Sequence, residues 1–336
     1  MKRLQLKKHD VKSINPYISE AIIKYLEEAL ADIENLIAED VKSIIDFQDK
    51  DGGFRPFVGE WIYDSDAYKR VADYPSYLCT LILINADLLN ITKVDKACIE
   101  KAFGYITKHG LRGHGYDAAL DEVNNINLFL ANGLKHYLSK YPNDFKSFKS
   151  FVEEAIKHYR SLYKTGKTVV GFGIDIRKEI AEMLDNADYT YYVAYGSNLN
   201  KGQMEDRCSG AELVETQTLK GYRLDFHLYL TITRDDKYNT PVAIWKINPD
   251  HEKSLDRYEG VRVGLYRKEY IRLIVLNSKR YCLVYLMNDI PERKNVVPTD
   301  RYIKTCMDGY RDLGFDESIL AETIERVNAL NNWLAA

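Results

Sequence analysis

The sequence predicts an α+β protein, in which an all-helical N-terminal domain is followed by a mixed β-barrel domain with flanking helices. Apolar residues recur at helical spacing through the first half, whereas β-prone runs separated by short turns dominate the second half. A length of 336 residues favours two domains. We expect the boundary near residues 165–188, with the domains at 1–185 and 186–336.

The composition is typical of a soluble globular protein, with 46% hydrophobic and 29% charged residues. A net charge of -3 gives no electrostatic footprint for nucleic acid. No run approaches the ~20 apolar residues of a membrane span, and the basic N-terminus lacks the apolar core of a signal peptide. The five cysteines are scattered without a Cys-x-x-Cys pair. We therefore expect a cytoplasmic protein that uses no metal or organic cofactor and binds neither nucleic acid nor membrane.

Helical periodicity is clearest near the start of the chain. Apolar residues recur there at steps of three and four, at Ile22, Leu26, Leu30, Ile33, Ile37, Val41 and Ile44. This spacing predicts one helix that ends before the turn signal Asp51-Gly52-Gly53. Further helices are predicted at residues 77–91, 96–108, 120–140 and 144–163.

Two stretches of the first half, FQDKDGGF and ITKHGLRGHGY, each end one helix and precede another. This arrangement resembles the helix–glycine-loop–helix units of α/α-toroid proteins, such as terpene cyclases and prenyltransferase β-subunits. The acidic motifs of terpene cyclases are not evident, so the role of this domain stays open, and a protein partner could bind it. His109 and His114 lack a recognised metal spacing and are interpreted as exposed loop residues.

The second half begins with a β-prone run at residues 191–195 that stops at Gly196-Ser197-Asn198. This pattern predicts a buried strand followed by a tight turn, whose backbone N–H groups could bind an anion. The alternative is an ordinary strand-to-helix turn with Asn198 as the helix cap.

Further β-like runs follow at residues 211–219, 222–233, 242–247, 266–275 and 280–287. The charged stretch at 234–239 is interpreted as a long turn, and 250–258 as a short helix that Gly260 can cap. Before the junction, we expect a turn at 165–173 and a helix at 174–184.

The order of motifs in this half is YGSNL, LKGYRL, WKI, LDRYEG, YRK, CLVYLM, PTDRY and GYRDLGFDE. This order resembles the γ-glutamylcyclotransferase-like family over residues 190–325. The resemblance implies an intramolecular aminolysis, in which the α-amine of a γ-glutamyl group attacks its own γ-carbonyl. The products are 5-oxoproline and a free amine. The substrate would be a γ-glutamyl amino acid, a γ-glutamyl amine or a γ-glutamylated biosynthetic intermediate.

The resemblance also implies roles for particular residues. Glu259 would act as general base and then as general acid, with a pKa raised by desolvation. Tyr285 and Tyr302 would donate hydrogen bonds near the site. The glutamyl-binding loop would comprise Tyr195, Gly196, Ser197, Asn198 and Leu199.

Other interpretations stay open. Glu259 could cap a helix or form a salt bridge, and the two tyrosines could serve in packing. The protein could also be a γ-glutamyl- or carboxylate-binding scaffold without turnover that acts through its helical half.

Overall fold

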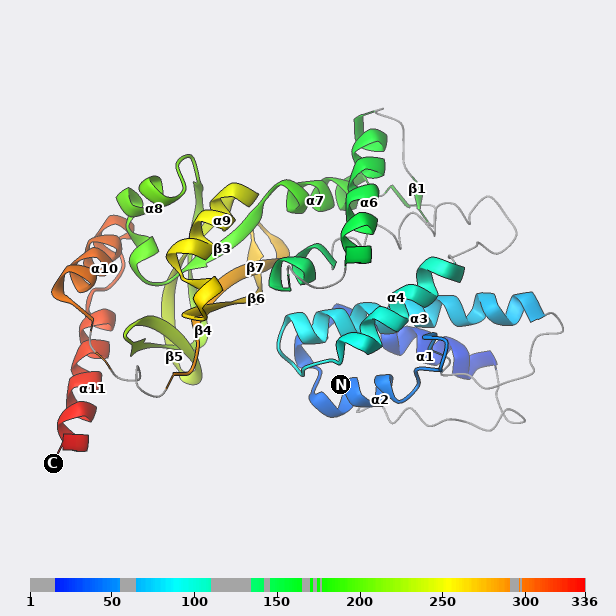
Figure 1. The fold of residues 1–336 in the computed structure, drawn as a ribbon, viewed down its shortest axis with the longest axis horizontal. Helices are drawn as coiled ribbons and strands as arrows, with labels where there is room; N and C mark the ends of the chain where they lie inside the picture. Colours follow the sequence, from blue (N-terminus) through cyan, green and yellow to red (C-terminus); the bar gives the residue numbers. More distant parts are fainter. Residues whose placement is uncertain are drawn as a thin grey trace. The chain divides into compact units, whose positions relative to one another are not determined.

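The computed structural model contains two compact units, Met1–Ala187 and Asp188–Ala336 (Figure 1). It describes residues 16–54, 65–109, 134–141, 146–164, 170–171, 174–175, 177–290, 296 and 298–335. The first unit is helical and the second is built on a mixed sheet, so the predicted fold class is confirmed.

The helical unit also contains one very short hairpin. Residues 134–140 are helical as well. Its named elements are α1 (Pro16–Ala31), the 3-10 helix η2 (Ile33–Asn35), α2 (Ala38–Ile45), α3 (Ser65–Leu88), α4 (Lys96–His109), α6 (Lys146–Lys164), β1 (Val170–Gly171), β2 (Ile174–Asp175) and α7 (Arg177–Asp188). The prediction of a turn at 165–173 and a helix from 174 is therefore wrong in detail, because β1 and β2 pair and the helix begins at Arg177.

The single helix predicted from the first apolar pattern is two helices separated by η2. Ile37 lies between them in an extended conformation, and the Asp40 carboxylate accepts its N–H at 3.1 Å, which caps α2. Ile33 and Val41 stay buried on either side of the break. The apolar spacing thus predicts which residues face the core, but it does not reveal that the backbone bends.

The first glycine loop of this unit packs against α4. A Cβ on Gly52 would lie 2.2 Å from the carbonyl oxygen of Lys101, and Gly52 has a φ of +97°. The side chain of Gln48 donates to the carbonyl of Cys98 at 2.9 Å. The second glycine stretch, residues 109–116, lies almost wholly outside the described residues, so the likeness to a toroid repeat stays a prediction.

The second unit contains a five-stranded sheet in the order β4-β5-β3-β7-β6. β3 runs antiparallel to β5 and parallel to β7. The strands are β3 (Thr190–Ala194), β4 (Glu212–His227), β5 (Tyr229–Ile247), β6 (Tyr266–Val275) and β7 (Ser278–Met287). The flanking helices are η3 (Ser197–Leu199), α8 (Lys201–Arg207), α9 (Pro249–Tyr258), η4 (Val261–Val263), α10 (Asp300–Leu313) and α11 (Ser318–Ala335).

The sheet curls until its two edge strands, β4 and β6, approach each other. The Gln217 side chain on β4 donates to the carbonyl of Ile274 on β6 at 2.6 Å. The N–H of Leu276, in the β6–β7 turn, donates to the Glu215 carboxylate at 3.4 Å. Within the described residues no backbone ladder joins these edges, so side-chain hydrogen bonds bring them together.

One strand prediction and one turn prediction in this unit are wrong. The tight turn of the β4–β5 hairpin is at Leu228, which has a φ of 81° and lies inside the strand predicted at 222–233. Residues 234–239, predicted to be a charged turn, belong to β5. Arg223 on β4 bonds Asp235 on β5 at 3.0 Å. Charged residues can extend a strand when they face solvent, and most of this stretch is exposed.

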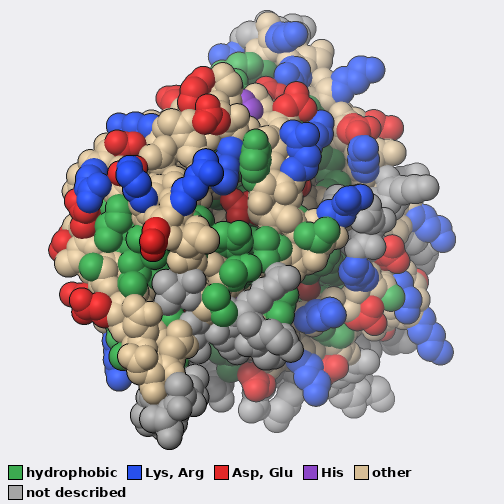
Figure 2. Space-filling view, turned by 60° about the vertical axis from the view of Figure 1, so that its left-hand side comes forward, with side chains coloured by type: hydrophobic (Ala, Val, Ile, Leu, Met, Phe, Trp, Pro, Cys, Tyr) green, Lys and Arg blue, Asp and Glu red, His purple; other side chains and the backbone are tan. Residues whose placement is uncertain are grey.

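The surface carries charges of both signs close together. On the face shown in Figure 2, Lys and Arg side chains alternate with Asp and Glu, and apolar side chains lie between them. Of the helices in the described ranges, none combines the length and the apolar character needed to cross a bilayer.

Candidate active site

The YGSNL turn leaves the end of β3 and leads directly into η3. Gly196 has a φ of -122°, so a left-handed backbone is not the reason for glycine here. Space is the reason, because a Cβ at this position would lie 3.3 Å from the Tyr302 hydroxyl and 3.4 Å from the Leu230 Cβ.

Several backbone N–H groups of this turn remain available. The turn's hydrogen bonds start with Leu199, whose N–H donates to the carbonyl of Gly196 at 2.9 Å, and Asn200, which donates to Ser197 at 3.1 Å. Among the described residues, the N–H groups of Gly196, Ser197 and Asn198 have no backbone acceptor. The first N–H groups of any helical turn lack intrahelical partners and can serve an anionic ligand.

The turn is held from outside by α10. A Cβ on Gly309 would lie 2.6 Å from the backbone nitrogen of Asn200 and 2.8 Å from the carbonyl carbon of Leu199. Leu199 is fully buried and serves in this packing. The prediction that Asn198 could cap a helix is wrong, because Asn200 caps α8 by accepting the N–H of Gln203 at 2.8 Å.

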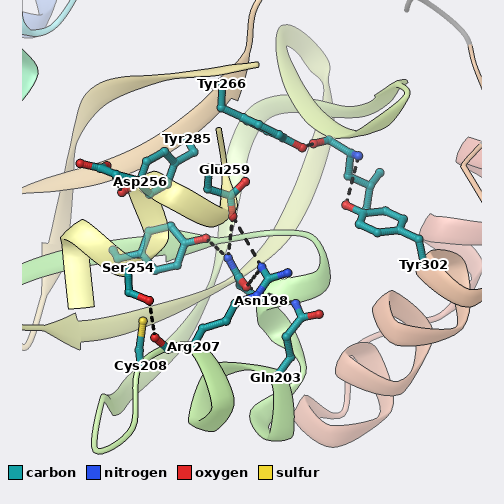
Figure 3. Close-up of polar contacts among 12 residues, drawn as sticks. Asn198, Gln203, Arg207, Cys208, Ser254, Asp256, Glu259, Tyr266, Tyr285 and Tyr302 are labelled. Carbon is teal, nitrogen blue, oxygen red and sulfur yellow. Dashed lines mark hydrogen bonds and ion pairs between the residues drawn. The ribbon is translucent and has the colours of Figure 1, made fainter. Parts of the chain in front are cut away.

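Asn198 is the central residue of a polar network (Figure 3). Its Nδ2 donates to the Tyr192 hydroxyl at 2.7 Å and to Glu259 Oε1 at 3.0 Å. Its Oδ1 accepts from Arg207 Nη1 at 2.7 Å and from Gln203 Nε2 at 3.2 Å. All four hydrogen-bonding positions of the amide are therefore used, which fixes its orientation.

Glu259 directly follows α9 and precedes Gly260, which has a φ of 61°. Its side chain is 13% exposed, and Arg207 Nη1 lies 3.8 Å from Oε1. Burial raises the pKa of Glu259 to about 7, against the lowering effects of Arg207 and of the Asn198 hydrogen bond. Within the described part of the chain, Oε2 makes no hydrogen bond. A carboxyl with this pKa and one free oxygen can take and return a proton near neutral pH.

A cluster of charges fixes α9 on the sheet. Lys268 on β6 is 9% exposed and forms ion pairs with Glu252 at 2.8 Å and Asp256 at 2.7 Å. The Tyr285 hydroxyl donates to Asp256 Oδ1 at 2.7 Å. That hydroxyl is therefore engaged with α9, and a direct hydrogen bond from it to substrate stays a prediction.

The other predicted tyrosines are buried beside the turn. The Tyr302 hydroxyl accepts the N–H of Leu230 at 3.2 Å, and burial raises its pKa well above the ordinary value. The Tyr195 hydroxyl donates to the carbonyl of Tyr285 at 2.6 Å. Tyr266 donates to the carbonyl of Leu230 at 2.7 Å. These hydroxyls remain protonated at neutral pH and link the strand ends around the turn.

The structure thus brings Glu259, Asn198, Gly196 and Tyr302 together. Ser197 is half-buried, and in the described structure its hydroxyl makes no hydrogen bond.

Sequence reasoning missed several contributors, among them Tyr192, Arg207 and Gly309. A glycine inside a helical pattern usually has a packing reason, which was a signal for Gly309. Tyr192 and Arg207 carry no comparable signal, because their spacing from Asn198 does not show that their side chains meet it.

The described ranges contain no group of three or more His, Cys, Asp or Glu side chains arranged to hold a metal ion. The described structure includes only the backbone of His109, while His114 lies outside the described residues.

The C-terminal half contains an AIG2-like family domain. The model of the AIG2-like family matches residues 241–319. This range includes Glu259, Tyr285 and Tyr302, and it begins after the YGSNL turn.

Homologues of this half include γ-glutamylcyclotransferases. Those of Mus musculus and Homo sapiens are each 26% identical to this chain, over 139 and 136 residues. The matches cover 38% and 37% of this chain, and 72% and 71% of the two relatives. A solved structure named as a gamma-glutamyl cyclotransferase is 24% identical with a TM-score of 0.36, and the match covers 42% of this chain and 88% of that one.

Proposed function

We propose that the C-terminal unit is a γ-glutamylcyclotransferase that releases 5-oxoproline from a γ-glutamyl amino acid, a γ-glutamyl amine or a γ-glutamylated biosynthetic intermediate. The observation that carries the proposal is the Glu259 carboxyl. It has a pKa of about 7, one free oxygen, and a hydrogen bond to Asn198 in the turn that offers N–H donors. The homology to γ-glutamylcyclotransferases supports the same reaction class.

The first step is removal of a proton from the α-ammonium of the substrate. Model α-amines titrate near ~8, so the amine is mostly protonated at neutral pH and cannot attack. The free Oε2 of Glu259 accepts that proton. The amine nitrogen then bonds to the γ-carbonyl carbon and closes the five-membered ring.

The second step is breakdown of the tetrahedral intermediate. The N–H groups of Gly196, Ser197 and Asn198 are donors for its oxyanion. The bond between the carbonyl carbon and the leaving nitrogen breaks as Glu259 returns its proton to that nitrogen. The ring nitrogen still carries one extra proton, which passes to the released amine. The products are 5-oxoproline and the amine in its ammonium form, and one carboxyl both removes the first proton and protonates the leaving nitrogen.

The reaction needs no covalent enzyme intermediate, because the nucleophile and the carbonyl belong to one molecule. Ser197 accordingly contributes through its backbone N–H. Tyr302 is placed to shape the turn, because its hydroxyl lies against Gly196.

The test is release of 5-oxoproline, followed by mass spectrometry, from a panel of γ-glutamyl amino acids, γ-glutamyl amines and glutathione. Glu259→Gln keeps the size of the side chain and an acceptor for Asn198 but cannot take the proton. We expect turnover by the wild type and a loss of at least ~100-fold in the variant. Glu205→Gln is the matched control, since Glu205 lies on α8 and its carboxylate bonds Ser209 and Gly210.

Equal rates for Glu259→Gln and the wild type would exclude Glu259 as the proton carrier. Binding of γ-glutamyl compounds without release of 5-oxoproline would favour the alternative, a binding or scaffold protein. In either form, we propose that the helical unit recognises a partner or the larger part of the substrate.

A further inference from the structure

We propose that Arg207 is a positioning residue for this site: it holds the Asn198 amide in one orientation and keeps Glu259 in its carboxylate form. The kinetic part of this inference rests on the proposed function, but the geometric part does not.

The first argument is the chemistry of the amide. Arginine only donates hydrogen bonds, so Arg207 Nη1 at 2.7 Å must face the oxygen of Asn198. Consequently the NH2 group of Asn198 faces Glu259 Oε1 at 3.0 Å. A donor at that distance stabilises the carboxylate over the neutral acid. If the amide turned around, its oxygen would face Glu259 and would favour a protonated carboxyl.

The second argument is charge. Arg207 Nη1 lies 3.8 Å from Glu259 Oε1, and its side chain is 20% exposed, so solvent screens this pair only partly. The other titratable groups that interact electrostatically with Glu259 are tyrosines: Tyr192 from β3, Tyr195 directly after β3, Tyr266 from β6 and Tyr302 from α10. These are neutral near pH 7. Among the described residues, Arg207 is the cation whose charge acts on Glu259.

The third argument is that Arg207 is itself held in place. Its guanidinium stacks over the ring of Tyr258 at 4.6 Å, and Tyr258 is the last residue of α9, immediately before Glu259. The backbone carbonyl of Arg207 accepts the hydroxyl of Ser254, also on α9, at 2.8 Å. Arg207 therefore joins the ends of α8 and α9 at the point where the turn meets the carboxyl.

The experiment measures the titration of Glu259 directly, by ¹³C NMR of protein labelled at the glutamate side-chain carboxyls. Glu259→Gln identifies the signal by its loss. Arg207→Met removes the charge and the donors but keeps an unbranched side chain over Tyr258. We expect the midpoint for Glu259 to rise by about 1–1.5 pH units. Arg207→Lys keeps the positive charge, so its Glu259 midpoint should lie between those of the wild type and Arg207→Met.

The pH–rate profile gives the second readout. In Arg207→Met the acid limb of the kcat/KM profile should move to higher pH by the same amount as the Glu259 midpoint. If the Glu259 midpoint rises by about 1–1.5 pH units, kcat/KM should fall by about 10- to 30-fold at pH 6 and by less than ~3-fold at pH 9. A merely structural defect would lower the rate at every pH by a similar factor.

The matched control is Arg311→Met, which removes an exposed arginine from α10 and should leave both readouts unchanged. If Arg207→Met does not fold, as judged by circular dichroism, Arg207→Gln replaces it with the same expected direction. An unchanged Glu259 midpoint in a folded variant would overturn the inference. Should the wild type release no 5-oxoproline, the proposed function fails, while the NMR titration still decides the role of Arg207.

Discussion

Replacing Glu259 with glutamine should stabilise the folded protein at alkaline pH while abolishing turnover. The carboxyl has a folded-state pKa of about 7, against a model value of 4.5. At about 1.4 kcal/mol per pH unit, that difference of about 2.5 corresponds to about 3 kcal/mol. The side chain is only 13% exposed, so little of this free energy is lost to solvent screening.

The sign follows from proton uptake. Because the folded-state pKa is the higher one, the folded protein binds more protons than the unfolded chain between pH 4.5 and 7. The contribution of Glu259 to the free energy of unfolding of the wild type is therefore fully present below pH 4.5 and is lost as the pH rises through 7. Glutamine cannot ionise, so the variant avoids that loss.

The assay is urea unfolding of the full chain at several pH values from 4.5 to 8.5, followed by fluorescence. The core substitution Leu283→Ala identifies the transition of the C-terminal unit, because it lowers the urea midpoint of that transition. We expect the free energy of unfolding of Glu259→Gln to exceed that of the wild type by about 3 kcal/mol at pH 8 and to equal it near pH 4.5. Glu205→Gln is the control, because the Glu205 carboxylate is exposed and its pKa is lowered. We therefore expect no increase in the free energy of unfolding of this variant at pH 8.

A difference that does not change with pH would refute the reasoning. It would mean that Glu259 has the same pKa in the folded and unfolded chains, and that burial does not disfavour its charged form. Such a carboxyl would be a weak base near pH 7, which would also remove the main support for its proposed role.

Three further substitutions test how the site is held. Gly309→Ala should lower the free energy of unfolding by about 1–3 kcal/mol and remove most of the turnover, because the added methyl group overlaps the YGSNL turn. Gly104→Ala, where the added methyl group meets open space, should be neutral or slightly stabilising in the same urea unfolding assay. Lys268→Met should lower the free energy of unfolding by about 3 kcal/mol, because it leaves two partly buried carboxylates on α9 without their cation. Tyr302→Phe should cost about 1 kcal/mol, since the N–H of Leu230 loses its acceptor. Unchanged urea midpoints for Lys268→Met or Tyr302→Phe would contradict these interpretations.

Local patterns carried most of what could be predicted from the sequence. The apolar run before Gly196 and the glycine after Glu259 each determine a local backbone event, a strand end and a helix end. By contrast, Leu228 makes a tight turn without glycine, asparagine or aspartate, so the β4–β5 hairpin could not be located from turn chemistry.

The polar network lay beyond sequence reasoning for a different reason. Asn198 and Glu259 are 61 residues apart, and the orientation of the amide depends on Arg207, which belongs to another helix. Similarly, the direction of the Tyr285 hydroxyl is decided by Asp256 and Lys268. Spacing in the chain does not show such contacts, because they depend on how the helices pack on the sheet.

The packing of Gly309 against Asn200 also has a consequence for synthesis of the chain. The turn and the helix that holds it are separated by about 110 residues, which take roughly 5–20 s to make at cellular rates of translation. During that interval the nascent chain can pair its early strands, but the turn lacks the surface against which it packs. We therefore expect the ability to bind a ligand at this turn to appear only after α10 has been synthesised, so that a ribosome-bound chain ending before Asp300 would fold its hairpins and yet be inactive.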